Sequence, residues 1–243
     1  MTRPAWRRGA SSLPCYSVKR MIVPPVRLGD LPDEFPVFPL SGALLLPRGR
    51  LPLKIFEPRY LAMVEDALGQ GRYFGMVQPD KRLPRGENGP GLYRTGCLGR
   101  ISSFEETDDG HYLINLTGVL RFTIAEEVEM RRGYRRVHAG LSGFAADLRA
   151  DDEALPFPRQ ILLDALDRYF AAAGAEANWE AIAEMNDAAL VVSLCMACPF
   201  EPEEKQALLE AKDPLLRAAA LRALLEIDSF DGGPGNGTTP KAS

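Results

Sequence analysis

The pattern of apolar residues changes once along the chain, near residues 144–158, and this change constrains the fold more than any other feature. Before it, short apolar or alternating segments are separated by turn residues, as in the strands of a sheet. After it, apolar residues recur at helical spacing. Strands followed by helices, instead of alternating with them, favour an α+β fold. We therefore expect a β-rich region over residues 29–150 and a helical region over residues 151–229.

The β-rich region begins with two segments that contain prolines. Proline cannot donate to a strand ladder, so Phe35–Leu40 is predicted to be an edge strand or an irregular extended segment. Leu51–Phe56 follows as a second extended segment. A helix should then start at Glu57-Pro58, because proline suits the first helical turn, and should end at Gly69. Alternation in the second segment places three residues on one face: Leu51, Leu53 and Ile55.

A series of strands with short turns follows and indicates a small barrel or sandwich. Asp108-Asp109-Gly110 is a strong hairpin signal, because glycine supplies the positive φ that such turns need. Residues 79–91 are rich in proline and glycine and are expected to form an exposed loop. The expected strands are 73–77, 92–104, 111–116, 119–128 and 134–141.

The C-terminal third is predicted to be helical. Asn186 or Asp187 caps an apolar helix, and Asp213-Pro214 is a second start signal. The longest apolar run, Ala188–Phe200, has about 13 residues where about 20 are needed to span a bilayer, so it reads as a buried helix. The expected helices are 160–173, 179–185, 188–198, 202–211 and a last one that ends near 227.

Charge is unevenly distributed along the chain. Residues 1–28 contain six basic and no acidic residues, whereas the remainder carries 23 basic and 33 acidic residues. An acidic body argues against general nucleic-acid binding, which needs a basic face. Residues 1–28 and 230–243 are expected to be disordered tails; the first could also be a transit-like segment, or reflect a start upstream of Met21. No secretory signal is found, so a reduced, cytoplasmic setting is expected.

Several separated motifs resemble the substrate-binding domain at the N-terminus of the Lon protease. The first is the run from Phe35 to Tyr60, with its "L-P-L-K-I-F-E-P-R-Y" ending. Gly99-Arg-Ile101, Leu116–Phe122 and Pro199–Glu210 also match, and they occur in the family's order. The resemblance covers roughly residues 30–228, and the related domain of cereblon has a similar proline-containing segment.

This resemblance implies a PUA-like mixed β-barrel followed by a helical bundle, and a role in substrate recognition. The sequence contains no Gly-x-x-x-x-Gly-Lys-Ser/Thr loop for holding phosphates and no Ser–Lys peptidase context. We therefore expect a stand-alone binding module that is not an enzyme and needs no cofactor. The expected partners are unfolded or hydrophobic polypeptide segments, with a protease or chaperone as a further candidate in protein quality control.

The candidate binding site is an apolar groove with a polar rim, beside segments whose prolines leave backbone groups available to an added strand. The polar residues also have a structural interpretation, in which Glu57 stabilises the helix start and Arg59 pairs with an acid. The groove is predicted to contain Leu46, Pro47, Leu53, Phe56, Glu57, Arg59 and Tyr60.

The cysteines and histidines are weaker candidates for a functional site. Cys195 and Cys198 form a CxxC pair, but they precede Pro199 at a helix C-terminus, where the dipole disfavours a thiolate. His111 and His138 have no nearby nucleophile and acid that would complete a triad. No metal site is expected, since zinc needs four ligands.

Two charged clusters complete the set of candidates. Acidic residues at 105–109 could hold a hard cation, but a solvated turn is the simpler interpretation. Lys81, Arg82 and Arg85 in the loop 79–91 could contact RNA, since PUA-like folds include RNA binders. A PUA-type nucleic-acid-binding module is therefore the alternative function, and membrane binding is not expected.

Overall fold

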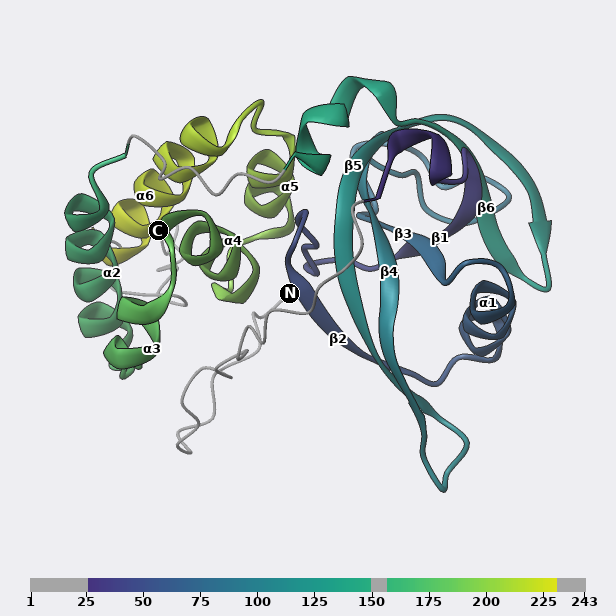
Figure 1. Cartoon of the computed structure of the whole chain (residues 1–243), viewed down its shortest axis with the longest axis horizontal. Helices are drawn as coiled ribbons and strands as arrows, with labels where there is room; N and C mark the ends of the chain where they lie inside the picture. The colour runs from purple at the N-terminus through teal and green to yellow at the C-terminus, as the bar shows by residue number, and fades with distance from the viewer. Residues whose placement is uncertain (1–25, 150–156, 231–243) are drawn as a thin grey trace, which may run out of the picture. The chain divides into compact units, whose positions relative to one another are not determined.

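The computed structural model describes residues 26–149 and 157–230. The predicted tails lie almost wholly outside these residues, and the predicted boundary at 150/151 falls in the gap between them. Two compact units are distinguished within the described chain. The β-rich unit combines residues 26–149 with the helix of residues 202–210, and the helical unit contains residues 157–200 and 211–230 (Figure 1). The predicted α+β class is confirmed.

The β-rich unit is a six-stranded sheet with the order β2-β5-β4-β3-β1-β6, in which β5 pairs additionally with β6. The long strand β5 makes this possible: residues 112–117 pair with β2, and residues 123–131 pair with β6. Every strand except β2 therefore has neighbours on both sides within the described residues. The strands are β1 Glu34–Pro39, β2 Arg50–Ile55, β3 Tyr73–Val77, β4 Thr95–Glu106, β5 Tyr112–Arg131 and β6 Tyr134–Gly140.

The first strand is not at an edge, and the prediction of an edge or irregular segment there was wrong. β1 pairs antiparallel with β6 over residues 34–37 and parallel with β3 over residues 37–39. Each side of the strand is thus bonded along only part of its length. This partial pairing explains how β1 accommodates Pro36 and Pro39, which have no backbone N–H. A missing N–H costs no ladder hydrogen bond at a position where the strand has no neighbour on that side. β2 is the edge strand instead.

β5 is one strand of 20 residues, whereas two strands with a break between residues 116 and 119 were predicted. Gly118 lies at that point, and its backbone packs so closely on Leu46 that an added Cβ would be 2.0 Å from the Leu46 carbonyl oxygen. The glycine therefore marks a close backbone approach instead of a turn. The predicted hairpin turn is confirmed, with Gly110 at φ 74° between β4 and β5.

The helix α1, Pro58–Gly69, begins and ends where the sequence predicted. Its buried face contains Tyr60, Ala62, Met63, Val64 and Ala67, while Leu61 and Leu68 are only half-buried. The core of the β-rich unit lies between the strands, where Phe35 meets Phe122 edge-to-face with ring centroids 5.0 Å apart.

The helix α5, Pro202–Glu210, belongs to the β-rich unit, although its periodicity placed it with the other helices. Polar bonds attach it to the sheet. Gln78 Nε2 donates to the Pro202 carbonyl at 2.9 Å, and Gln206 Nε2 donates to the Thr95 carbonyl at 3.1 Å. Arg121 Nη1 donates to the Leu209 carbonyl at 3.1 Å. These bonds satisfy buried polar groups that would otherwise carry a desolvation cost.

The helical unit contains α2 Arg159–Ala173, α3 Trp179–Glu184, α4 Asp187–Ala197 and α6 Pro214–Phe230. Asn178 and Asn186 cap α3 and α4 by accepting backbone N–H bonds, and the second of these caps was predicted. Gly174 ends α2 in the left-handed conformation, at the predicted end of this helix. α6 packs against α2 and α4 (Figure 1). Among residues 26–149 and 157–230, no helix is both long enough and apolar enough to cross a bilayer.

Candidate functional site

The free edge of the sheet is β2, which pairs only with β5 among the described residues, from Arg50 opposite Thr117 to Ile55 opposite Tyr112. The predicted alternation along it is confirmed: Ile55 is buried and Leu53 is half-buried, whereas Pro52 and Lys54 are exposed. An edge strand presents unpaired backbone groups to which a further strand can add.

Beside this edge, β2 and the adjoining ends of β4 (residues 101–106) and β5 (residues 112–117) form a three-stranded segment, here called the extension. Leu53, Ile114 and Phe104 lie side by side on one of its faces, because Leu53 and Phe104 both pair with Ile114. Leu113 lies on the other face, opposite Lys54.

Three large apolar side chains of the extension and its continuation are exposed to solvent: Phe56 by 58%, Phe104 by 40% and Leu113 by 40%. The two aromatic rings each contact one other ring: Phe104 lies 4.9 Å from Tyr112 and Phe56 lies 6.0 Å from His111, measured between ring centroids. Phe56 follows β2 directly and Leu113 lies on the adjacent strand β5, whereas Phe104 lies on β4, which β5 separates from the free edge. Exposed apolar residues beside an open strand edge make this edge a candidate binding surface.

The structure brings only part of the predicted groove to the surface. Leu46 and Pro47 are buried and cannot contact a ligand, and Tyr60 is only 6% exposed because it packs on Phe38 with ring centroids 4.3 Å apart. These three residues belong to the core. Leu53 is half-buried and Phe56 is exposed, so these two side chains are accessible.

The polar residues of the predicted groove form a local ion pair at the start of α1. Arg59 donates to the Glu57 carboxylate from Nε at 3.0 Å and from Nη2 at 2.7 Å. The Arg59 guanidinium also lies 4.6 Å from the centre of the Tyr60 ring. The Glu57 side chain makes no capping hydrogen bond to the helix, and the acid that pairs with Arg59 in the structural interpretation is Glu57 itself. Both residues are accessible beside Phe56.

At the tip of the extension, Asp109 organises the hairpin turn. The Thr107 hydroxyl donates to it, Lys54 Nζ lies 3.7 Å away and His111 Nδ1 lies 2.8 Å away. The hydrogen bond from Thr107 lowers the pKa of the Asp109 carboxyl. Within the described residues no group of His, Cys, Asp and Glu side chains has the arrangement of a metal site.

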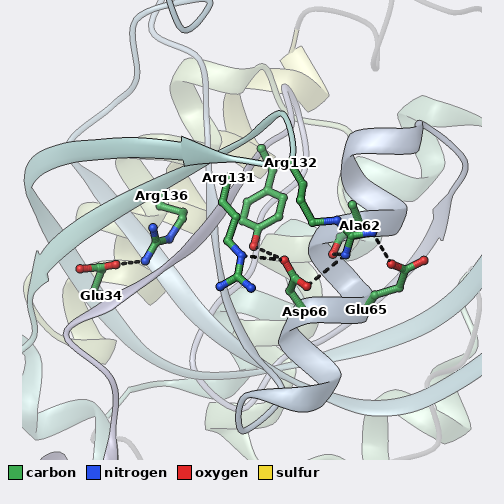
Figure 2. Close-up of polar contacts among 8 residues, drawn as sticks. Glu34, Ala62, Glu65, Asp66, Arg131, Arg132 and Arg136 are labelled. Atoms are coloured by element: carbon green, nitrogen blue, oxygen red, sulfur yellow. Dashed lines mark hydrogen bonds and ion pairs between the residues drawn. The ribbon is translucent and has the colours of Figure 1, made fainter.

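A polar cluster connects α1 to the turn between β5 and β6 (Figure 2). Asp66 accepts from the Tyr134 hydroxyl at 2.6 Å and from Arg132 Nη1 at 3.1 Å. Glu65 accepts from Arg132 Nη2 at 2.7 Å and from the Tyr112 hydroxyl at 3.2 Å. Because Tyr112 belongs to the extension, this cluster holds α1 and the extension in a fixed relation.

The electrostatics of this cluster favour an ionised Asp66. Burial alone would raise the pKa of its carboxyl, but hydrogen bonds from Tyr134 and Arg132 outweigh burial and lower it. The pKa of Tyr134 is raised, first by burial and then by its bond to Asp66. The proton therefore stays on the phenol and the charge on the carboxylate, which gives a charge-assisted hydrogen bond.

The cysteines and histidines within residues 26–149 and 157–230 occupy structural positions. Cys97, Cys195 and Cys198 are buried, and burial raises the pKa of Cys195 to about 12. A thiol with this pKa is a poor nucleophile at neutral pH. His138 Nε2 lies 3.2 Å from the Glu34 carboxylate in the sheet, and His111 belongs to the turn at Asp109.

The basic loop is partly neutralised. Arg82 forms a two-bond ion pair with Asp80, and Lys81 Nζ lies 3.6 Å from the Glu203 carboxylate of α5. Two of the three cations proposed for RNA binding therefore have acidic neighbours, and this gives the nucleic-acid alternative little support.

Comparison with known proteins decides the family. The profile of the ATP-dependent protease La (LON) substrate-binding domain matches residues 34–226. The chain belongs to this family. Lon protease 1 of Bdellovibrio bacteriovorus is 26% identical over 194 residues, which are 78% of this chain and 24% of that protein. Lon protease 2 of Myxococcus xanthus is 26% identical over 100 residues, which are 41% of this chain and 12% of that protein. The Lon-family chain thus aligns with less than a quarter of each of these relatives.

Solved structures support the same fold. A Lon N-terminal domain protein from Xanthomonas campestris has a TM-score of 0.55 at 23% identity, covering 78% of this chain and 97% of its own. The N-terminal domain of a Mycobacterium avium complex Lon protease has a TM-score of 0.56 at 15% identity, covering 79% and 97%. The relation to the Lon substrate-binding domain predicted from the sequence motifs is confirmed, and it supports a substrate-recognition module.

Sequence reasoning missed Phe104 and Leu113 as surface residues of this Lon-family domain. Both lie in strands that flank the predicted turn at residues 108–110, and apolar residues there read as ordinary strand positions. The signal that could have found them is their place near the hairpin tip, beside Glu105 and Glu106, where a core is hard to close. Their exposure follows from the length of β4 and β5, which periodicity alone does not give.

Proposed function

We infer that this chain is a non-catalytic polypeptide-binding module that takes up extended hydrophobic segments at the free edge of β2. The observation that carries this inference is the free edge of β2 with exposed Phe56 directly after it and exposed Leu113 on the neighbouring strand β5, in a domain of a substrate-binding family. Exposed Phe104 lies one strand further from the edge, on β4. A ligand strand would gain backbone bonds from the edge and apolar contacts from these side chains.

The faces of the extension suggest what the ligand should look like. Apolar residues occur on both faces, with Phe104 on one and Leu113 on the other. A bound strand projects alternate side chains to opposite faces, so both faces would be used only by a segment that is apolar on both sides. Such segments are buried in folded proteins and become accessible when a protein unfolds. The Glu57–Arg59 pair supplies a polar border.

The wider role follows from this recognition. We propose an adaptor in protein quality control that has no peptidase or ATPase activity of its own and passes unfolded clients to a protease or chaperone. The closed series of pairings from β5 through β4, β3, β1 and β6 back to β5 supports a PUA-like barrel, and α2, α3, α4 and α6 would form the accompanying bundle.

Binding can be tested with the full chain and a permanently unfolded polypeptide, reduced and carboxymethylated lactalbumin carrying a fluorophore. We expect saturable binding by anisotropy, and Phe56→Asp should raise Kd about tenfold, which corresponds to about 1.4 kcal/mol. Met130→Asp is the matched control, because Met130 is also exposed in β5 but lies at its opposite end from the extension. Its Kd should stay within about twofold of the wild type. Equal affinity of the two variants would contradict the site.

Strand addition makes a separate prediction. Peptides from the bound region, N-methylated at alternate residues in two registers, lose the donors of one strand edge at a time. One register should weaken binding strongly and the other should not, because only one edge of an added strand faces β2. If both registers bind like the unmodified peptide, the apolar residues bind without strand pairing and this part of the proposal is wrong.

A further inference from the structure

The last helix, α6, has a second apolar face that no described element covers. Its buried face contains Arg217, Ala218, Leu221 and Leu225 and packs towards α2 and α4. On the opposite side, Leu216 is 51% exposed, Ile227 54% and Phe230 87%. Ala219 and Ala223 between them are also exposed. A surface helix ordinarily presents polar residues on its outer side, so this face is unusual.

The spacing of this outer face is that of a helix-pairing seam. Leu216, Ala220, Ala223, Ile227 and Phe230 follow each other at intervals of four, three, four and three residues. At 100° per residue these positions fall within an arc of roughly 80°. A stripe this narrow fits one neighbouring helix, and alternation of four and three is the pattern of coiled-coil packing.

We propose that the outer face of α6 pairs with α6 of a second copy of this chain, in antiparallel orientation. The side-chain sizes along the stripe are symmetric about Ala223, with large residues at both ends and alanines near the centre. An antiparallel copy centred there sets Leu216 against Phe230, Ala220 close to Ile227, and Ala223 against itself. Large residues then meet at the ends, and alanines at the centre let the two helices approach closely.

Charge selects the orientation. Arg222 and Glu226 lie on one flank of the stripe, whereas Leu224 lies on the other. Antiparallel pairing brings like flanks together, so Arg222 of each copy faces Glu226 of the other. Parallel pairing would set this charged flank against Leu224. Within one chain Glu226 is 3.8 Å from both Arg222 and Arg168, and these long contacts leave its oxygens able to accept stronger bonds.

The seam spans about 14 residues, or roughly 21 Å of helix. Pairing over this length buries less than a standard protein interface, so a reversible dimer that forms with rising concentration is expected. This inference is independent of the proposed polypeptide binding, because α6 shares no residue with the extension.

Sedimentation equilibrium of the full chain over a range of concentrations tests the interface. We expect a monomer–dimer equilibrium that Ile227→Glu weakens at least tenfold. Ile161→Glu is the control, because Ile161 is also 40% exposed but lies on α2, outside the stripe and its charged flank. Both substitutions are at exposed positions and introduce a good helix former, so circular dichroism should show an intact fold. A monomer at all concentrations, or an equal effect of the two variants, overturns the proposal.

Cysteine cross-linking tests the orientation, in a Cys15→Ser background that leaves the buried thiols in place. Ala223→Cys should form an intermolecular disulfide, and Leu216→Cys should cross-link to Phe230→Cys but not to itself. Self cross-linking of Leu216→Cys, without its cross-linking to Phe230→Cys, would indicate a parallel pair and contradict the antiparallel register.

Discussion

At the scale of single residues, Asp66 is the polar group whose loss should matter most. Its side chain is 14% exposed and accepts hydrogen bonds from Tyr134 and Arg132. Because these bonds lower its pKa in the folded protein, they stabilise the fold above about pH 4, and this contribution is lost as the pH falls through the lowered pKa. Asp66→Asn should therefore cost about 1–3 kcal/mol at pH 7 and progressively less in acid. Urea denaturation at pH 7 and pH 3 would measure this. Glu65→Gln, at a more exposed carboxylate, should cost less at pH 7; a pH-independent cost of Asp66→Asn would contradict the argument.

Gly118 offers a second prediction at this scale, and it concerns the backbone. A Cβ at this position would lie 2.0 Å from the Leu46 carbonyl oxygen and 2.8 Å from its carbonyl carbon, and backbone atoms cannot move away cheaply. Gly118→Ala should therefore destabilise the protein by about 3 kcal/mol or abolish folding. Gly143→Ala meets no atom within 4 Å and should be nearly neutral. Comparable melting temperatures for the two variants would show that the strand can shift away from Leu46.

At the scale of elements, local signals were reliable where the cause is local. Pro58, Gly69, Gly174 and the cap at Asn186 mark helix ends correctly, because capping is satisfied within a few residues. The neighbours of β1 could not be predicted, since they depend on which distant strands pair with each half of it. Tyr60 was placed at the surface because its contact with Phe38 joins residues 22 positions apart.

The attachment of α5 is the element-level feature with the clearest test. Gln78 Nε2 donates to the Pro202 carbonyl, and Gln78 is only 2% exposed. Gln78→Leu removes this donor and leaves the Pro202 carbonyl without its hydrogen bond from Gln78. We therefore expect the free energy of unfolding to fall by about 1–3 kcal/mol. Amide exchange in α5 should accelerate more than exchange in α1. Unchanged protection of α5 would show that apolar contacts alone hold it on the sheet.

At the scale of the whole molecule, the order of strands before helices was sufficient to predict the α+β class. It was not sufficient to assign every helix to its unit. The periodicity of residues 202–210 resembles that of the other helices, and only Gln206 and Lys205, which are buried polar residues on a short helix, indicate a different environment. The proposed binding surface was predicted only in part, because Phe56 lies in a motif whereas the exposure of Phe104 and Leu113 depends on the length of the hairpin.

The division of the chain into units leads to a last prediction, for hydrogen exchange under mild denaturant. Residues that unfold together exchange with one free energy, whatever their order in the sequence. The amides of α5 should therefore share the denaturant dependence of β4 and β5, to which Gln206 and Arg121 connect it. The amides of α4 and α6, which flank α5 in the sequence, should follow a second dependence common to α2, since α2 and α4 both pack on α6. If the amides of α5 instead showed the denaturant dependence of α4 and α6, the polar bonds to the sheet would not make α5 unfold with the β-rich unit. The helix α5 would then have to be assigned to the helical unit. Thr95, the acceptor for Gln206, provides the internal check: its strand should lose protection at the same denaturant concentration as α5.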